Sequence, residues 1–239
     1  MADYLVMALE DEQAHASQPA KAMAQLIEES AAYADDLRAA GHLLDHGRFR
    51  PSKEGKRLRR EGERLAVRGG PFAEDGKALG GYYCVQASSL DEAAGLAARA
   101  PALASDAIDV RPVMKRVVPP GANRETLPGK IFGCAVLGSA PTEDAWVAVM
   151  NRIDKEGSGS FPAGSFLGGI RLEPPTTGRR IAMRGEKRAT FDGPFLESKE
   201  VIGGLFLVRM ASLDEVVEWA GDKPFLAYGG LEIRELWRT

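Results

Sequence analysis

Cysteine and histidine are both scarce in this sequence of 239 residues. Each of the two cysteines, Cys84 and Cys134, lies in an apolar run (GYYCVQA and IFGCAVL), so we expect buried free thiols. The sequence has no CxxC, HExxH, EF-hand or GxGxxG pattern. We therefore expect neither a disulfide scaffold nor a metal site, and we predict no cofactor.

An excess of one charge and long apolar runs are also missing. The net charge is −3 and the isoelectric point about 5.8, which gives no support for a nucleic-acid partner. One basic run, at 53–68, is interleaved with glutamates, and we interpret it as a solvated turn or loop. No apolar run reaches the roughly 18 residues of a membrane span, and the N-terminus turns acidic at once. We expect a cytoplasmic protein with no membrane partner.

The sequence does contain an internal repeat. The segment DGPFLESKEVIGGLFL at 192–207 resembles GGPFAEDGKALGGYYC at 69–84, an offset of 192 − 69 = 123 residues. At that offset, sixteen of the forty-three positions of 69–111 are identical in 192–234, without a gap. A period this long indicates two copies of a domain and not a solenoid of short repeats.

Hydrophobic patterning predicts the elements of the first copy. Ser17 is the expected N-cap of a long amphipathic helix that stops at Gly41, and Ser89 with Glu92 forms a capping box for a second helix. We predict helices at 17–41 and 90–100 and strands at 3–9, 42–49, 63–69, 80–88 and 107–113.

The second copy repeats this order. Thr142 is the expected N-cap of its first helix, and Ser212 with Glu215 forms the capping box of its second. We predict the first helix at 142–157 and strands at 130–138, 164–174, 180–185, 203–211 and 231–237.

The order in each copy, β-α-β-β-β-α-β, is close to a ferredoxin-like α+β unit with one extra strand. Helices on one face of an antiparallel sheet leave the other face to be covered, and a second sheet can cover it. We therefore predict two domains, at 1–114 and 130–239, that pack sheet to sheet as a pseudo-dimer. The segment 115–129, rich in proline, glycine and polar residues, is the predicted linker.

The phrase DGPFLESKE, followed by GGLFLV, SLDEVVEW and LEIRE, resembles the DGPF group of YCII-related proteins. The first copy departs from the pattern where Gly69 replaces the aspartate and where Asp75 and Gly76 follow. The resemblance covers nearly the whole chain and implies a dimeric α/β-barrel fold. It implies little biochemistry, because most members have no known activity. Some relatives are cofactor-free enzymes that use a histidine and an aspartate, and genes of the group often lie beside those of sigma factors.

The repeated phrase has a structural and a chemical interpretation. The residues GPF favour a turn between two strands, because proline restricts φ. Asp192 is either a turn acceptor or a carboxylate that faces a pocket, and Glu197 is a candidate ligand contact. Because the first copy has Gly69, only the second copy could use this aspartate as a catalytic base.

The three histidines do not reproduce the family's chemistry. His15 is expected to be solvated in a polar loop. His42 and His46 share one strand face with Arg48 by period-two alternation, either inside the barrel or, as we favour, at a surface or dimer interface. The resemblance places the enzymes' histidine in the first helix, where Tyr33 is the nearest polar ring.

Arg48 and Arg171 occupy equivalent strand positions, where each could bind a ligand carboxylate or, as we favour, form an internal salt bridge. Three functions stay open. The first is binding of a small organic molecule in a barrel cleft, in a regulatory or stress-linked role. The second is a cofactor-free lyase, isomerase or hydrolase with Asp192 as base and an arginine as anion holder. The third is an interaction module for a sigma factor or another regulator; a homodimer of the whole chain is a further possibility.

Overall fold

The computed structural model describes residues 1–72, 77–103, 105–122, 129–138, 142–157, 161–184, 187–193 and 201–237. The helices are α1 (Glu12–Ala16), α2 (Ala20–Ala39), α3 (Leu90–Ala97), α4 (Glu143–Gly157) and α5 (Leu213–Gly221), with 3-10 turns η1 (Ser52–Glu54), η2 (Pro175–Thr177) and η3 (Pro224–Ala227). The strands are β1 (Ala2–Glu10), β2 (Leu43–Arg48), β3 (Lys56–Glu61), β4 (Arg64–Gly69), β5 (Ala78–Ala87), β6 (Ala107–Val117), β7 (Lys130–Gly138), β8 (Phe166–Leu172), β9 (Arg179–Arg184), β10 (Lys187–Asp192), β11 (Val201–Met210) and β12 (Gly229–Glu235). Among the described residues, none of the helices has the length and apolarity to span a membrane.

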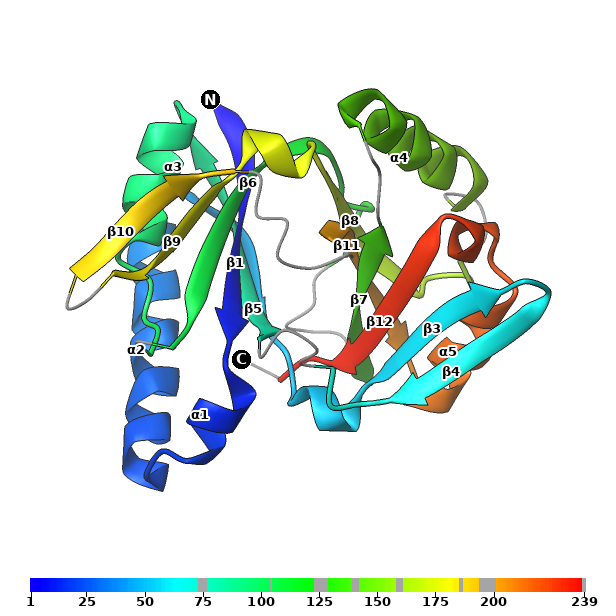
Figure 1. The fold of residues 1–239 in the computed structure, drawn as a ribbon, viewed down its shortest axis with the longest axis horizontal. Helices are drawn as coiled ribbons and strands as arrows, with labels where there is room; N and C mark the ends of the chain where they lie inside the picture. Colours follow the sequence, from blue (N-terminus) through cyan, green and yellow to red (C-terminus); the bar gives the residue numbers. More distant parts are fainter. Residues whose placement is uncertain are drawn as a thin grey trace.

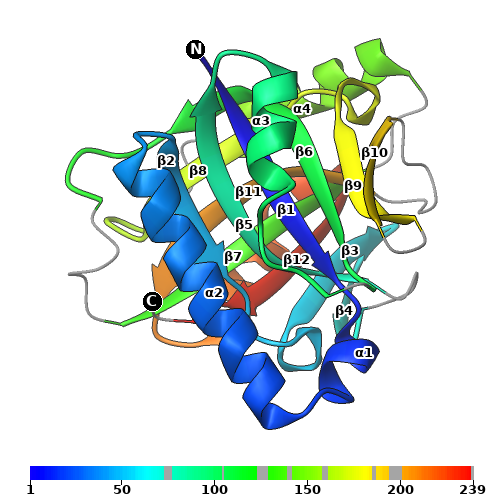
Figure 2. The ribbon, with the colours of Figure 1, turned by 90° about the vertical axis from the view of Figure 1, so that its left-hand side faces the viewer.

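The first copy forms an antiparallel sheet in the order β2-β5-β1-β6, with α2 and α3 packed on one face (Figure 1 and Figure 2). Alternation along β1 sends Val6 toward the helices, where it meets Tyr33 and Leu37 of α2, and sends Leu5 to the opposite face. The sheet is therefore apolar on both faces, and its second face needs a partner.

Local signals set most helix ends as predicted. Gly41 has φ +76° directly after the last turn of α2, a conformation that favours glycine. Ser89 and Ser212 each accept a hydrogen bond from the backbone amide three residues later, as a capping box requires. The predicted start at Ser17 is wrong, because the short helix α1 ends there and α2 begins after Pro19.

The second copy forms an equivalent sheet in the order β8-β11-β7-β12. Its outer face buries Phe132 and Val208 against Val216 of α5 and Leu226 of η3. Both copies therefore present the same layered unit, with helices outside and one sheet face left for the partner.

The inner faces of the two sheets enclose one shared core. On one side, β6 runs on from the first sheet and pairs with β8 of the second, from Val113 opposite Leu172. On the other side, Phe49 bridges to Leu236, and the Trp237 amide donates to the Arg48 carbonyl at 2.8 Å. The predicted sheet-to-sheet packing is confirmed, and the two copies close into one barrel of the dimeric α/β type.

The copies also exchange hairpins, which the sequence analysis did not predict. The hairpin β3–β4 of the first copy pairs with β12 of the second, and β9–β10 of the second copy pairs with β6 of the first (Figure 1). The interpretation of 53–68 as a solvated turn or loop is therefore wrong. Its arginines alternate with residues such as Leu58, which is fully buried against β12, so the run is a half-buried strand pair.

Two buried arginines fasten the copies to one another. Arg234 donates to the backbone carbonyls of Arg50 (3.2 Å) and Leu79 in the first copy. Arg111 donates to the two equivalent carbonyls of the second copy, 123 residues further along the chain. These arginines are the identical residue of IDVRP and LEIRE in the two copies. Each copy therefore donates equivalent arginine hydrogen bonds to the other, which we call the arginine fastenings.

Candidate functional site

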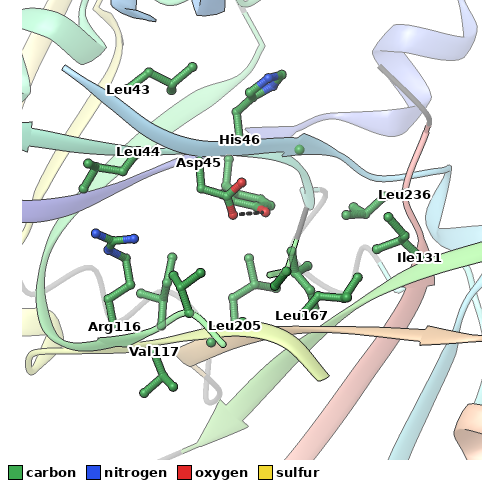
Figure 3. Close-up of a pocket in the computed structure, with 18 of the residues that line it drawn as sticks. Leu43, Leu44, Asp45, His46, Arg116, Val117, Ile131, Leu167, Leu205 and Leu236 are labelled. Carbon is green, nitrogen blue, oxygen red and sulfur yellow. Dashed lines mark hydrogen bonds between the residues drawn. The ribbon is translucent and has the colours of Figure 1, made fainter. Parts of the chain in front are cut away.

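A cavity of about 550 Å³ lies between the two sheets, where the first copy, the second copy and the residues after β6 meet (Figure 3). We call it the barrel cavity. Most of the residues that line it are apolar, and many of these also belong to the core of the barrel. The apolar residues of the wall include Leu44, Ile131, Leu167, Ile170, Leu205, Leu207 and Leu236.

Among the described residues of the wall, Asp45 and Tyr82 form a polar pair that faces the barrel cavity. The Tyr82 hydroxyl donates a hydrogen bond to Asp45 Oδ2 at 2.9 Å, and both side chains belong to the cavity wall. The Tyr82 ring fits because residue 47 is glycine; a Cβ there would lie 2.9 Å from Tyr82 Cε1. The pair therefore places oxygen atoms beside the apolar residues of the wall.

An irregularity in β2 aims Asp45 into the cavity. The pairing of β2 with β5 shifts register between Leu43 and Asp45, which inserts one residue into the strand. Leu44 packs in the barrel core, whereas Leu43 packs on the helix side. As a result Asp45 points into the cavity and His46 points away from it (Figure 3).

Cationic side chains stand at the edge of the cavity, and each one described here has an acidic or aromatic partner. Arg116 Nε lies 2.8 Å from Asp3 Oδ2. The Arg50 guanidinium lies over the ring of Trp237, which is also in the wall, at 4.1 Å from the ring centroid. Arg50 also lies 3.4 Å from Glu54 Oε2 and 3.6 Å from Glu235 Oε1, so each of these two arginines has a carboxylate partner.

Asp192, the predicted base, lies at the end of β10 and is not part of the cavity wall. Its side chain is 81% exposed and accepts a hydrogen bond from Arg179 Nε at 2.8 Å. The neighbouring Gly193 amide donates to the Gly178 carbonyl at 3.0 Å, so the start of the phrase ends the exchanged hairpin. Glu197, the other candidate in this phrase, lies outside the described residues.

The two arginines at equivalent strand positions have different partners. Arg48 pairs with Glu10 at 2.9 Å, the internal salt bridge that we favoured. Arg171 donates to the backbone carbonyl of Met150 at 2.8 Å. Neither side chain lines the barrel cavity, so a ligand-binding role for either stays a prediction.

Of the remaining candidates, only His46 borders the cavity. Its Nε2 lies 3.3 Å from Arg38 Nη2, and its ring stacks on Tyr83 on the helix side. His42 Nδ1 lies 2.9 Å from the Gln86 carbonyl. The Tyr33 hydroxyl donates to the Leu96 carbonyl at 2.8 Å, and burial raises its pKa. His42, His46 and Arg48 therefore do not form one group inside the cavity, the alternative that we did not favour.

The expectation that His15 is solvated is wrong. Only 9% of its side chain is exposed, and its Nε2 lies 3.0 Å from both carboxylate oxygens of Asp106. Its Nδ1 lies 3.8 Å from Glu10 Oε2. Burial lowers the pKa of His15, but the Asp106 hydrogen bond and the charges of Glu10 and Asp106 outweigh it, and the pKa is raised.

Asp45 and Tyr82 were not predicted as a pair from the sequence. Strict alternation placed Asp45 opposite His46 but could not say which of the two faces the barrel. The inserted residue in β2 and the space at Gly47 decide that question, and both depend on pairing with β5. The available signal was a carboxylate within the apolar run HLLDHG.

Comparison with known proteins gives a family but no activity. The sequence model of the family described as "YCII-related domain" matches residues 3–116 and 139–239, two regions that agree with two tandem copies. A curated protein of Rhizobium meliloti (strain 1021), described as uncharacterized, is 38% identical over 52 residues. That match covers 22% of this chain and 42% of the relative, so the chain spans less than half of that relative's length.

Two solved structures are similar at low sequence identity. An anthrone oxidase-like protein is 7% identical with a TM-score of 0.45, over 99% of this chain and 91% of the other. A putative chlorite dismutase is 11% identical with a TM-score of 0.34, over 99% and 95% of the two chains.

Proposed function

This chain belongs to the YCII-related domain family, and we propose that it binds a small organic molecule in the barrel cavity. The observation that carries the proposal is the cavity itself, which is lined mainly by apolar residues of both copies and by the polar pair Asp45 and Tyr82. Sites for small molecules are typically concave, roughly 300–1,000 Å³ in volume, and apolar with a few placed polar groups. The barrel cavity, at about 550 Å³, lies within this range of volume and combines apolar residues with a small number of polar side chains.

The proposed role is recognition without turnover, in a regulatory or stress-linked setting. The resemblance to the DGPF group supports that setting. The geometry favours binding over the alternative in which Asp192 acts as a base, because Asp192 is exposed and paired with Arg179 outside the cavity wall.

The test is a thermal-shift screen of diverse small metabolites on the full chain, followed by two cavity-filling variants. Leu44→Phe and Ile131→Phe each add volume from a different copy, at positions that are only partly buried and so leave room for a ring. Val67→Phe is the matched control, because Val67 is exposed on β4 outside the cavity wall.

We expect hits that raise the melting temperature of the wild type and of Val67→Phe, since a ligand that binds only the folded state stabilises it. The same hits should have little effect on Leu44→Phe and Ile131→Phe. A screen without hits, or hits that stabilise both filled variants as strongly as the wild type, would contradict the proposal.

A further inference from the structure

The barrel cavity lies on the approximate twofold relation between the copies, and equivalent residues of both copies line it. The strand pairing supports the equivalence independently of the sequence match. Asp45 pairs with Cys84 in the first copy, and Gly168 pairs with Leu207 at the same 123-residue offset in the second. Leu44 and Leu167 are equivalent in the same way, and both are in the wall.

The two halves of the wall differ in chemistry at these equivalent positions. The second copy has Gly168 where the first has Asp45, and Leu205 where the first has Tyr82. A symmetric ancestor would present the same groups twice. Among the described residues of the wall, the charged side chains and the tyrosine come from the first copy, and the residues of the second copy are apolar.

The polar wall favours one kind of ligand group. The Tyr82 hydroxyl donates a hydrogen bond to Asp45, and a carboxylate has two oxygens with several lone pairs, so Asp45 can accept a hydrogen bond from a ligand group in addition to the one from Tyr82. A neutral hydroxyl or an amine can donate to it. A ligand carboxylate would instead bring negative charge next to Asp45.

The arginines at the edge of the cavity do not create a preference for an anionic ligand. Arg116, near the end of β6, is one of the arginines of the wall and has an ion-pair partner in Asp3. Arg38 is paired with Asp35 on α2, near the outward-pointing His46. An anionic ligand would have to compete with these carboxylates for the arginines.

We propose that the barrel cavity binds an asymmetric, mostly apolar molecule that carries a hydrogen-bond donor, with its hydroxyl or amine on Asp45 and its hydrocarbon part against the second copy. This inference rests on the proposed function and adds the chemical class and the orientation of the ligand. Asp45 is then the residue that determines specificity, and Tyr82 positions it.

The test compares four probes of equal shape on the full chain: 2-naphthol, 2-aminonaphthalene, 2-methylnaphthalene and 2-naphthoate. Dissociation constants are measured by ligand-observed NMR at neutral pH. We expect the hydroxyl or the amine probe to bind about tenfold or more tightly than the methyl probe, since a hydrogen bond to a charged acceptor is worth that factor. The naphthoate should bind most weakly.

Three variants make the test specific. Asp45→Ala should remove the preference for donor probes and leave the affinity of 2-methylnaphthalene within about twofold. Asp45→Asn keeps the size and one acceptor oxygen, so it should weaken the amine more than the hydroxyl; it also serves if the alanine variant does not fold. Asp192→Ala is the matched control, because it removes an exposed carboxylate outside the cavity and should change no affinity.

The outcomes separate the inference from the function on which it rests. If the methyl probe or the naphthoate binds as tightly as the donor probes, or if Asp45→Ala keeps the donor preference, the inference is wrong while binding in the cavity stands. If none of the four probes binds and the metabolite screen is also empty, both the inference and the proposed function fail.

Discussion

Gly80 in the first copy and Gly203 in the second occupy equivalent strand positions, but the groups packed over them differ. A Cβ at Gly80 would lie 1.9 Å from the carboxyl carbon of Glu10, which is held by Arg48. A Cβ at Gly203 would lie 2.8 Å from the terminal methyl of Met150.

Both copies therefore have a glycine at which a neighbouring side chain comes close to the backbone, but the type of that side chain differs between the copies. In the first copy the space holds Glu10, which faces Arg48 and His15. In the second copy Met150 and Trp146 fill it, and the Trp146 indole donates to the Leu172 carbonyl at 3.2 Å. The charged network of the first copy and the apolar side chains of the second, which we call the apolar plug, both fill the space above a glycine. Glycine has no side chain, so it allows either kind of group to come close to the backbone.

Removing the apolar plug should have the largest effect. Trp146→Ala empties a fully packed position, and we expect a loss of about 4 kcal/mol in the free energy of unfolding. Chemical denaturation of the variant against wild type measures it. Trp219→Ala is a control of the same chemistry at a partly buried site and should lose less. Equal losses would show that the plug is not the better-packed position.

The second prediction tests whether the two arginine fastenings are equally strong. Arg234 has a buried carboxylate partner, Glu232 at 3.0 Å, in addition to its two carbonyls, whereas the two hydrogen bonds of Arg111 go to backbone carbonyls. Burial lowers the pKa of Arg111 to about 10.

Arg234→Met should therefore cost about 3 kcal/mol, because it leaves a buried carboxylate with one fewer partner, and Arg111→Met about 1–2 kcal/mol. Urea unfolding curves of the two variants decide the order. A larger loss for Arg111→Met would reverse the comparison.

Substitution of the two glycines tests the difference between the copies directly, with a smaller expected change in the free energy of unfolding. Gly80→Ala should cost about 2 kcal/mol, because the new methyl group meets a carboxylate fixed by Arg48. Gly203→Ala should cost less than about 1 kcal/mol, because the flexible end of Met150 can move aside. Neither glycine has a positive φ, so the difference reports on the neighbours alone. Equal costs would mean that the charged network yields as readily as the methionine.

The charged network should also make the stability of the first copy depend on pH. The pKa of His15 is raised in the folded state, so its stabilisation is complete below the unfolded value of about 6.5 and is lost as pH rises through the folded pKa. The groups that face His15 are Glu10, Asp106 and Arg48, and burial raises the pKa of Glu10, which acts in the same direction.

The stability advantage of wild type over His15→Gln should thus shrink between pH 5.5 and 8.5, by at most about 1.4 kcal/mol per pH unit. Denaturation midpoints of both proteins across that range measure it. An advantage that grows with pH would contradict the raised pKa.

The smallest effect is expected at Asp192, the aspartate that the first copy lacks. Its ion pair with Arg179 is exposed, and such pairs contribute little. Asp192→Asn should shift the melting temperature by less than about 2 °C, and it should leave ligand binding in the barrel cavity unchanged. A clear loss of binding would return Asp192 to the list of functional residues.

The features predicted correctly depend on residues close together in the chain. Ser89, Ser212 and Gly41 act within one helical turn, so their caps could be predicted from the letters alone. The 123-residue repeat predicted two equivalent units, and the expectation that helices cover only one face of each sheet predicted that the units pack sheet to sheet.

The features that were missed depend on residues far apart. From the sequence, Arg57 was interpreted as part of a solvated charged run, but in the structure it lies 2.8 Å from Glu232. His15 was expected to be solvated, but its ring lies beside Asp106. Periodicity alone could not find the inserted residue in β2 that turns Asp45 inward, because register is set by the partner strand.

The sequence by itself thus determined the number of copies, their helices and most of their strands, because these follow from local propensity and from a repeat that can be counted. Tertiary structure alone decided the exchange of hairpins, the pairing of buried charges and the assembly of a single asymmetric cavity. The physical reason is that these features arise where segments some 35 to 180 residues apart come into contact, and the free energy of each group is set by the neighbour it meets there.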